Sequence, residues 1–242
     1  MKYLMLIVLL IDLALADQIE YKQMEIPSTG SKELEFFVLD VFNKQVKNIS
    51  ESDFKILENG ALVNDFRIEC SNEISIPQIS SYLMIDNSGS MDGKGINIAL
   101  SAANKWIERL KNYGHDYECG VGVFNSIVTH KQDLTNNDYY LKYAINTIIP
   151  GGGTDFNQAY LGFNGAINNL KNAGYNKVLI FLTDGFSNVD FTEVIKQANK
   201  HNITIYNIVI GNPVPGSLYD ISKSTGGLSF GNVKSELEAV DI

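Results

Sequence analysis

The chain is poor in cysteine and histidine, the side chains that most often bind transition metals. Its 242 residues contain two cysteines and three histidines. Cys70 and Cys119 lie too far apart for a Cys-x-x-Cys motif, and the histidines at positions 115, 130 and 201 show no metal-ligand spacing. The sequence therefore excludes a Cys-x-x-Cys metal or redox centre and gives no support for a histidine-bound metal.

Basic residues are also scarce. Nineteen Lys and Arg residues stand against 28 Asp and Glu residues, so the formal net charge is -9 and the sequence pI is about 4.8. A surface of that sign repels phosphate backbones, which argues against general nucleic-acid binding and agrees better with cation binding. Because 45% of the residues are hydrophobic, we expect a packed core.

Long apolar runs are missing after the first sixteen residues, so we expect no transmembrane segment. Residues 1–16 have the pattern of a secretory signal peptide: Lys2, an apolar run over residues 3–11, and Ala-Leu-Ala at residues 14–16 before Asp17. Asp12 departs from this pattern, and the alternative is a buried N-terminal strand. The signal peptide predicts a secreted, extracellular protein.

Secretion leaves two alternatives open for the cysteines. In an oxidising compartment Cys70 and Cys119 could form a disulfide, which would contribute about 4 kcal/mol in the loop-entropy model. They could equally be two buried free thiols. Asn48 and Asn202 each begin an N-glycosylation sequon, and we expect Asn202 to be hindered because it opens an apolar strand.

The chain divides into two regions after the signal peptide. Residues 17–78 form a small β-rich module with a polar connector; strands are expected at residues 34–42, 54–57 and 62–68, with a turn at residues 58–60. Residues 79–242 alternate between apolar strands and amphipathic helices. Strands are expected at residues 82–85, 121–124, 178–182, 203–210 and 228–230, with helices at residues 96–110, 140–148, 156–170 and 190–198. Apolar residues on both strand faces predict a doubly wound, mostly parallel α/β sheet covered by helices on both sides.

The loops that follow the strands carry the candidate chemistry. Open α/β sheets bind ligands beyond the carboxyl ends of their strands. Asp86, Ser88 and Ser90 follow the first strand of the second region, and Asp184 follows the third. Thr154 ends a glycine-rich loop just before a helix, so we expect all five side chains to meet at one sheet edge. Such an all-oxygen set suits a hard cation: Mg²⁺ is our first choice, with Mn²⁺ and Ca²⁺ as alternatives.

These motifs resemble a known family. Asp86-Asn87-Ser88-Gly89-Ser90 is similar to the D-x-S-x-S signature of the metal-ion-dependent adhesion site in von Willebrand factor type A domains, and Thr154 and Asp184 resemble the family's later metal-site residues. The resemblance covers residues 79–242 and implies a Rossmann-like fold. It also implies that Ser88, Ser90 and Thr154 contact the metal directly, whereas the two aspartates act through water or as hydrogen-bond acceptors.

The resemblance implies a protein-binding function. Neutral hydroxyl ligands leave the metal able to accept an Asp or Glu carboxylate from a protein partner, for example an extracellular-matrix or cell-surface protein. We therefore expect a cation-dependent adhesion module, not an enzyme, and expect that Asp86→Ala or Thr154→Ala removes binding while the fold remains. The alternatives are a metal-assisted hydrolase using the same site, or a metal-free scaffold or assembly subunit.

Other motifs do not explain the same residues. An EF-hand would require glycine at Met91 and a bidentate Glu at Asn97. The glycine-rich loop is not followed by Gly-Lys-Ser/Thr, as a phosphate-binding P-loop would be.

Overall fold

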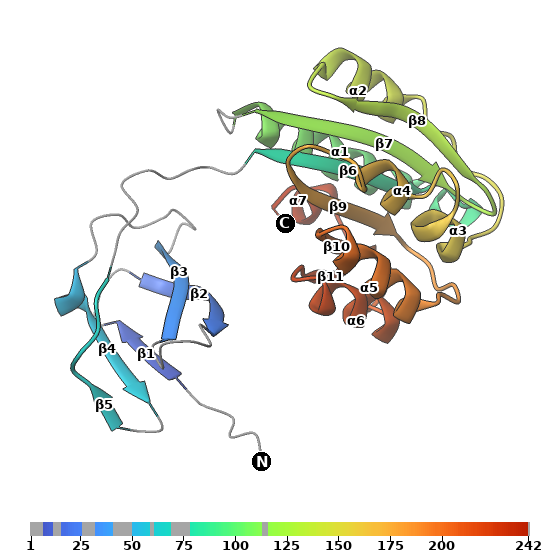
Figure 1. Ribbon diagram of the computed structural model, residues 1–242. Helices are drawn as coiled ribbons and strands as arrows, with labels where there is room; N and C mark the ends of the chain where they lie inside the picture. Colours follow the sequence, from blue (N-terminus) through green and yellow to red (C-terminus); the bar gives the residue numbers. More distant parts are fainter. Residues whose placement is uncertain are drawn as a thin grey trace. The chain divides into compact units, whose positions relative to one another are not determined.

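The chain forms two compact units, Met1–Ser75 and Ile76–Ile242. The computed structural model describes residues 7–11, 16–25, 32–40, 50–58, 61–68, 78–112 and 116–241. Figure 1 shows both units. Within the described ranges, no helix has the length and apolar character needed to cross a membrane.

The N-terminal unit is built from antiparallel strands. Its elements are β1 (Ile7–Ile11), β2 (Ala16–Glu25), β3 (Lys32–Asp40), the 3₁₀ helix η1 (Glu51–Asp53), β4 (Phe54–Glu58) and β5 (Ala61–Val63). β4 lies between β1 and β5, and β2 pairs with β3. Glu58 pairs with Ala61, and residues 59 and 60 of the predicted turn lie outside the described residues. β5 is shorter than predicted, because residues 64–68 leave the strand.

Part of the predicted signal peptide forms a strand in the full chain. β1 pairs in antiparallel register with the whole of β4, from Ile7 opposite Glu58 to Ile11 opposite Phe54. β2 begins at Ala16, the residue before the predicted cleavage point. Cleavage is a processing event, so it stays a prediction; if it occurs, β4 loses one of its two neighbouring strands.

The C-terminal unit is a six-stranded sheet in the order β11-β10-β9-β6-β7-β8. Its strands are β6 (Ile79–Asp86), β7 (Tyr117–Phe124), β8 (Val128–Thr135), β9 (Asn176–Thr183), β10 (Ile203–Ile210) and β11 (Ser229–Val233). Every neighbouring pair is parallel except β7 and β8, which form an antiparallel hairpin. The predicted doubly wound, mostly parallel α/β fold is confirmed.

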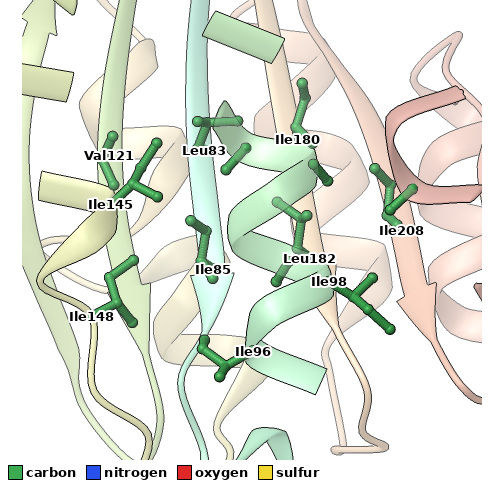
Figure 2. Packing of buried hydrophobic residues seen from close by; sticks show 14 of the residues in the cluster. Leu83, Ile85, Ile96, Ile98, Val121, Ile145, Ile148, Ile180, Leu182 and Ile208 are labelled. Carbon is green, nitrogen blue, oxygen red and sulfur yellow. The ribbon is translucent and has the colours of Figure 1, made fainter. Parts of the chain in front are cut away.

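Helices cover both faces of this sheet. They are η2 (Gly89–Met91), α1 (Lys94–Asn112), α2 (Asp138–Asn146), α3 (Phe156–Leu161), α4 (Ala166–Leu170), α5 (Phe191–Lys200), α6 (Gly216–Ser224) and α7 (Glu236–Asp241). Side chains alternate across each strand, so Leu83 and Ile85 of β6 pack under α1 while Tyr82 and Met84 pack among α3 to α6. Figure 2 shows the first of these two cores, in which β6 and β9 lie beneath α1.

The C-terminal unit differs from the sequence-based expectation at several elements, and α6 is one that was not predicted. The helix expected over residues 156–170 is divided into α3 and α4, with Gly162 and Gly165 at the break and Phe163 92% exposed between them. A Cβ on Gly162 would lie 2.5 Å from the carbonyl oxygen of Gln158, which explains glycine at this position. β8 was not predicted at all, because its sequence is polar and lies at the sheet edge.

The structure describes only some of the cysteines and glycosylation sequons that the sequence singled out. Cys119 is a buried free thiol, and burial raises its pKa to about 12. Cys70 lies outside the described residues, so the disulfide stays a prediction. Asn48 also lies outside them. Asn202 is exposed and adopts a left-handed backbone conformation just before β10, and the expected steric hindrance of its sequon stays a prediction.

Candidate metal site

The predicted site lies where the sheet changes winding direction. β6 has β7 on one side and β9 on the other. The chain runs from β6 to β7 and β8 at one edge of the sheet, and then crosses back past β6 to β9, β10 and β11 at the other edge. Open α/β sheets bind ligands at such a switch point. Asp86 is the last residue of β6, and Asp184 directly follows β9. The register pairs Ile85 with Leu182, which places Asp86 beside Thr183.

Asp86 is fully buried, and its carboxylate accepts two hydrogen bonds. Its Oδ1 accepts from the Ser88 backbone N–H at 2.8 Å, and its Oδ2 accepts from the Thr183 hydroxyl at 2.6 Å. Burial raises the pKa of Asp86 above its ordinary value; hydrogen bonds from Ser88 and Thr183 oppose this, and the negative charge of Asp184 adds to it. The site thus holds a carboxylate whose negative charge is poorly solvated.

A chain of short contacts connects this carboxylate to the second one. η2 turns the backbone sharply after Ser88, so that the Ser88 and Ser90 hydroxyl oxygens lie 3.1 Å apart. The Ser90 hydroxyl donates to Asp184 Oδ1 at 3.0 Å. Ser88 is buried, Ser90 is exposed and Asp184 is half-buried, so the oxygens lead from the sheet edge out to solvent.

Thr154 reaches the same place from the glycine-rich loop. A Cβ placed on Gly185 would lie 3.9 Å from Asp86 Oδ2 and 4.0 Å from Thr154 Oγ1, so both oxygens border one small volume. The Ser187 hydroxyl donates to the backbone oxygen of Thr154 at 3.2 Å and fixes its backbone. The structure therefore brings together all five residues singled out in the sequence, whereas their role as metal ligands stays a prediction.

Backbone hydrogen bonds connect the loops that carry these residues. The Asn87 N–H donates to the Phe124 carbonyl at 2.8 Å, and the Asn87 carbonyl accepts from Gly151 N–H at 2.7 Å. Gly89 N–H donates to the Gly152 carbonyl at 3.0 Å. The loop after β6 is thus fixed to the end of β7 and to the loop that positions the threonine.

Asn125 is the centre of this loop network. Its Nδ2 donates to the Gly151 carbonyl at 2.8 Å, its Oδ1 accepts from Ile127 N–H at 3.0 Å, and its backbone oxygen accepts from Asp155 N–H at 2.8 Å. Gly152 has a φ of +86°, and a Cβ there would lie 3.1 Å from the Asn125 side chain, which explains glycine at this position.

Two residues at this site were not predicted from the sequence. Thr183 hydrogen-bonds to Asp86, and Asn125 positions the glycine-rich loop. Both end or directly follow strands that point to the same sheet edge. Examining the end of every predicted strand, including residues 121–124, would have drawn attention to Asn125.

Two aromatic residues flank the predicted ligands. Phe156 is fully buried at the start of α3 and packs edge-on against Phe124 and Phe181. Phe186 is 64% exposed, two residues beyond Asp184. The first therefore belongs to the core, and the second is free to contact a ligand.

The chemistry of this set fits a hard cation. Two carboxylates and three hydroxyls meet, and no Lys, Arg or His of residues 78–112 and 116–241 hydrogen-bonds to any of the five. A buried carboxylate without a basic partner is stabilised by a cation. Within the described ranges, no group of three or more His, Cys, Asp and Glu side chains is placed to hold a metal, so any ion here would depend on the neutral hydroxyls.

A further polar atom at the site lacks a partner. The Asn87 Oδ1 atom is buried and accepts no hydrogen bond from the residues that the structure describes, although Asn87 Nδ2 donates to the Ile149 carbonyl at 2.9 Å. Asn87 directly precedes Ser88. An unsatisfied oxygen at this position agrees with a site that is completed by water or by a ligand.

Comparisons with known proteins agree with the fold of the C-terminal unit. The family model described as von Willebrand factor type A domain matches residues 82–241. The solved structure of the conserved hypothetical protein BatB from Bacteroides thetaiotaomicron is 17% identical, with a TM-score of 0.56, covering 66% of this chain and 93% of that one. The SpRpn10 VWA domain is 17% identical, with a TM-score of 0.55 and coverages of 67% and 93%. Curated protein sequences give no match.

A third solved structure has the same fold at lower identity. The vWF domain of the type V pili tip protein Mfa5 from Porphyromonas gingivalis is 12% identical, with a TM-score of 0.53, covering 68% of this chain and 93% of that one. The sheet order and the polar site at its switch point define a doubly wound α/β domain. Because the family match spans well over half of the chain, the chain belongs to the von Willebrand factor type A domain family, whose members commonly mediate protein interactions.

Proposed function

We propose that this chain is a secreted, divalent-cation-dependent protein-binding module and not an enzyme. Ser88, Ser90 and Thr154 would hold the cation directly, with Asp86 and Asp184 as charged acceptors around it. When bound, the cation supplies a Lewis-acidic position that a partner's Asp or Glu carboxylate can occupy. The observation that carries this proposal is the meeting of two carboxylates and three hydroxyls without a basic side chain.

The charge balance of the site favours a carboxylate partner. Three of the five side chains are neutral hydroxyls, so two carboxylates neutralise a divalent cation but add no excess negative charge. A third carboxylate from a partner can then approach without meeting a strongly negative centre. Mg²⁺ is our first choice, because it is a hard cation that accepts few protein carboxylates and keeps positions open for other oxygens.

The described side chains around the site support a binding function over catalysis. A metal-assisted hydrolase would require a general base near the bound water. The Ser88, Ser90 and Thr154 hydroxyls have no His or Lys hydrogen-bonded to them within residues 78–112 and 116–241. The hydrolase is therefore the weaker of the two functions, and a metal-free scaffold is the outcome if no cation binds.

The first test is calorimetric titration of the chelator-stripped protein with Mg²⁺, Mn²⁺ and Ca²⁺. We expect binding by the wild type and at least a tenfold weaker affinity in Thr154→Ala and Asp86→Asn. Asn is preferred to Ala at Asp86, because the buried carboxylate accepts two hydrogen bonds and Ala would leave both donors unsatisfied. The expectation that Asp86→Ala spares the fold stays a prediction.

The matched control is Asp92→Ala. Asp92 is an exposed aspartate two residues beyond Ser90, and its carboxylate accepts a hydrogen bond from the Gly93 N–H. Its replacement should leave cation affinity unchanged. Equal cation affinity in Thr154→Ala and wild type, with both proteins folded by circular dichroism, would refute the assigned site.

A further inference from the structure

Three large apolar side chains are exposed on the loops that surround the proposed metal site. Ile127 is 68% exposed, Ile149 is 78% exposed and Phe186 is 64% exposed. We call these three residues the apolar rim. Single exposed apolar residues are ordinary on protein surfaces, but a group of them around a polar site indicates an interaction surface.

Each rim residue is tied to the site by its backbone. The Ile149 carbonyl accepts from Asn87 Nδ2 at 2.9 Å, next to Ser88. The Ile127 N–H donates to Asn125 Oδ1, whose amide holds the glycine-rich loop. Phe186 follows the Asp184-Gly185 pair in the chain. The three residues therefore come from three different loops at the same edge of the sheet.

These loops carry no basic side chain. Residues 87–93, 125–127, 147–155 and 184–190 contain no Lys or Arg, and their charged residues are all aspartates: Asp92, Asp155, Asp184 and Asp190. The nearest basic residue along the chain is Lys94, which is exposed at the start of α1. A partner carboxylate therefore has no basic side chain to pair with on these loops. Additional acidic residues of the partner would form no ion pair there and would be repelled by the chain's net charge of -9.

We propose that the partner offers one acidic residue embedded in an apolar segment, whose side chains pack on Ile127, Ile149 and Phe186. The inference rests on the proposed function, because the metal-bound carboxylate fixes the centre of the contact. Affinity beyond the carboxylate then comes from apolar burial on the rim and not from ion pairs. The partner sequence would be an isolated Asp or Glu between apolar residues, and not a run of acidic residues.

The test uses straight-chain carboxylic acids as probes in the presence of Mg²⁺. Acetate, butyrate and hexanoate all offer one carboxylate, and they differ only in apolar length. Dissociation constants are measured by NMR shift titration of the ¹⁵N-labelled protein. We expect affinity to rise with each added methylene, by at most about fourfold, which corresponds to full burial of that group. Chelator should abolish binding of all three acids.

Rim variants separate the inference from the proposed function. Phe186→Ser and Ile149→Ser should bind Mg²⁺ and acetate as the wild type does, but should lose most of the preference for hexanoate. The matched control is Phe163→Ser. Phe163 is 92% exposed and follows the C-terminal end of α3, whereas Thr154 precedes the N-terminal end of that helix. This control should keep the wild-type dependence on chain length.

The contrary outcomes are distinct. Mg²⁺-dependent binding of acetate and hexanoate with equal affinity would overturn the apolar partner while leaving the cation site in place. Tighter binding of a glutamate tetrapeptide than of hexanoate would also overturn it. If no acid binds in a Mg²⁺-dependent way to the wild type, the proposed function fails and the inference fails with it.

Discussion

Asn125 shows how one side chain without contact to a ligand can define a binding site. It lies at the end of β7 and joins the turn at Ile127 to the glycine-rich loop at Gly151. That loop carries Thr154, the one hydroxyl of the set that is far in sequence from both aspartates. The side-chain amide of Asn125 therefore helps to position Thr154 relative to Asp86, although Asn125 lies outside both the loop after β6 and the glycine-rich loop.

The first prediction follows from this position. Asn125→Ala removes two hydrogen bonds of the loop network, so Thr154 should be less well placed and Mg²⁺ affinity should fall by about tenfold or more. The measurement is calorimetric titration alongside thermal unfolding. Asn172→Ala, at an exposed turn after α4, is the control. A lower unfolding midpoint with unchanged Mg²⁺ affinity would show that Asn125 acts on stability alone.

Residue types, strand ends and the family resemblance were sufficient to select five side chains that the structure brings together. Asp86, Ser88, Ser90, Thr154 and Asp184 were identified because oxygen donors followed strands or preceded a helix in the sequence. Their contacts could not be obtained in this way. The Ser90 to Asp184 hydrogen bond joins residues that are close only because β6 and β9 are neighbours in the sheet.

At the scale of elements, the end of α1 and the start of α2 are joined by one ion pair. Lys111 Nζ lies 2.8 Å from Asp138 Oδ2, and the Tyr117 hydroxyl donates to Asp138 Oδ1 at 3.0 Å. The hydrogen bond from Lys111 lowers the pKa of Asp138 below its ordinary value. Because the pKa is lower in the folded state, the contact stabilises the fold above the ordinary aspartate pKa.

The second prediction concerns this pair and pH. Its stabilising effect should be lost as the pH falls through the folded-state pKa of Asp138, and Asp138→Asn should remove this part of the acid sensitivity. The effect should be small, because the Lys111 side chain is 65% exposed and salt screens the pair. Urea unfolding from pH 7 to pH 3, at low and high salt, measures it.

The control for this pair is Asp220→Asn on the exposed side of α6. Its pH profile should follow that of the wild type. An Asp138→Asn profile that is parallel to the wild type at every pH and salt concentration would contradict the assigned role of the pair.

Some bounds of helices and strands could not be predicted from the hydrophobic pattern of the sequence. The apolar spacing of residues 156–170 continues across Gly162 and Gly165, so it predicted one helix where the chain forms two. β10, by contrast, was predicted at its observed bounds, because Ile203–Ile210 is apolar almost throughout and buried on both faces. Edge strand β8 is half-exposed and polar, and it is defined by its pairing with β7 rather than by its own residues.

At the scale of the whole molecule, the open question is processing of the first sixteen residues. β1 contributes a strand to the N-terminal unit of the full chain, opposite β4. Removal of residues 1–16 would leave β4 paired with β5 alone. The mature N-terminal unit would therefore have a new open strand edge, and open edges are available for pairing with other chains.

The last prediction is that the exported protein begins at Asp17. Mass spectrometry of protein recovered outside the producing cell should show this N-terminus. Leu9→Arg should keep the chain inside the cell, because a charge in the short apolar run opposes export. The matched control is Leu62→Arg. Leu62 is exposed on strand β5, so this variant protein should still be exported. Recovery of an extracellular protein that still begins at Met1 would refute the signal peptide.

The sequence by itself determined the alternation of strands and helices, the apolar character of both sheet faces and the identity of the oxygen donors. These are local properties, because side-chain periodicity and residue chemistry act within a few positions of the chain. Only the tertiary structure decided the strand order, the antiparallel edge strand and the meeting of three loops around Asp86. Those features depend on pairing and packing between segments far apart in the chain, which no short stretch of sequence encodes alone.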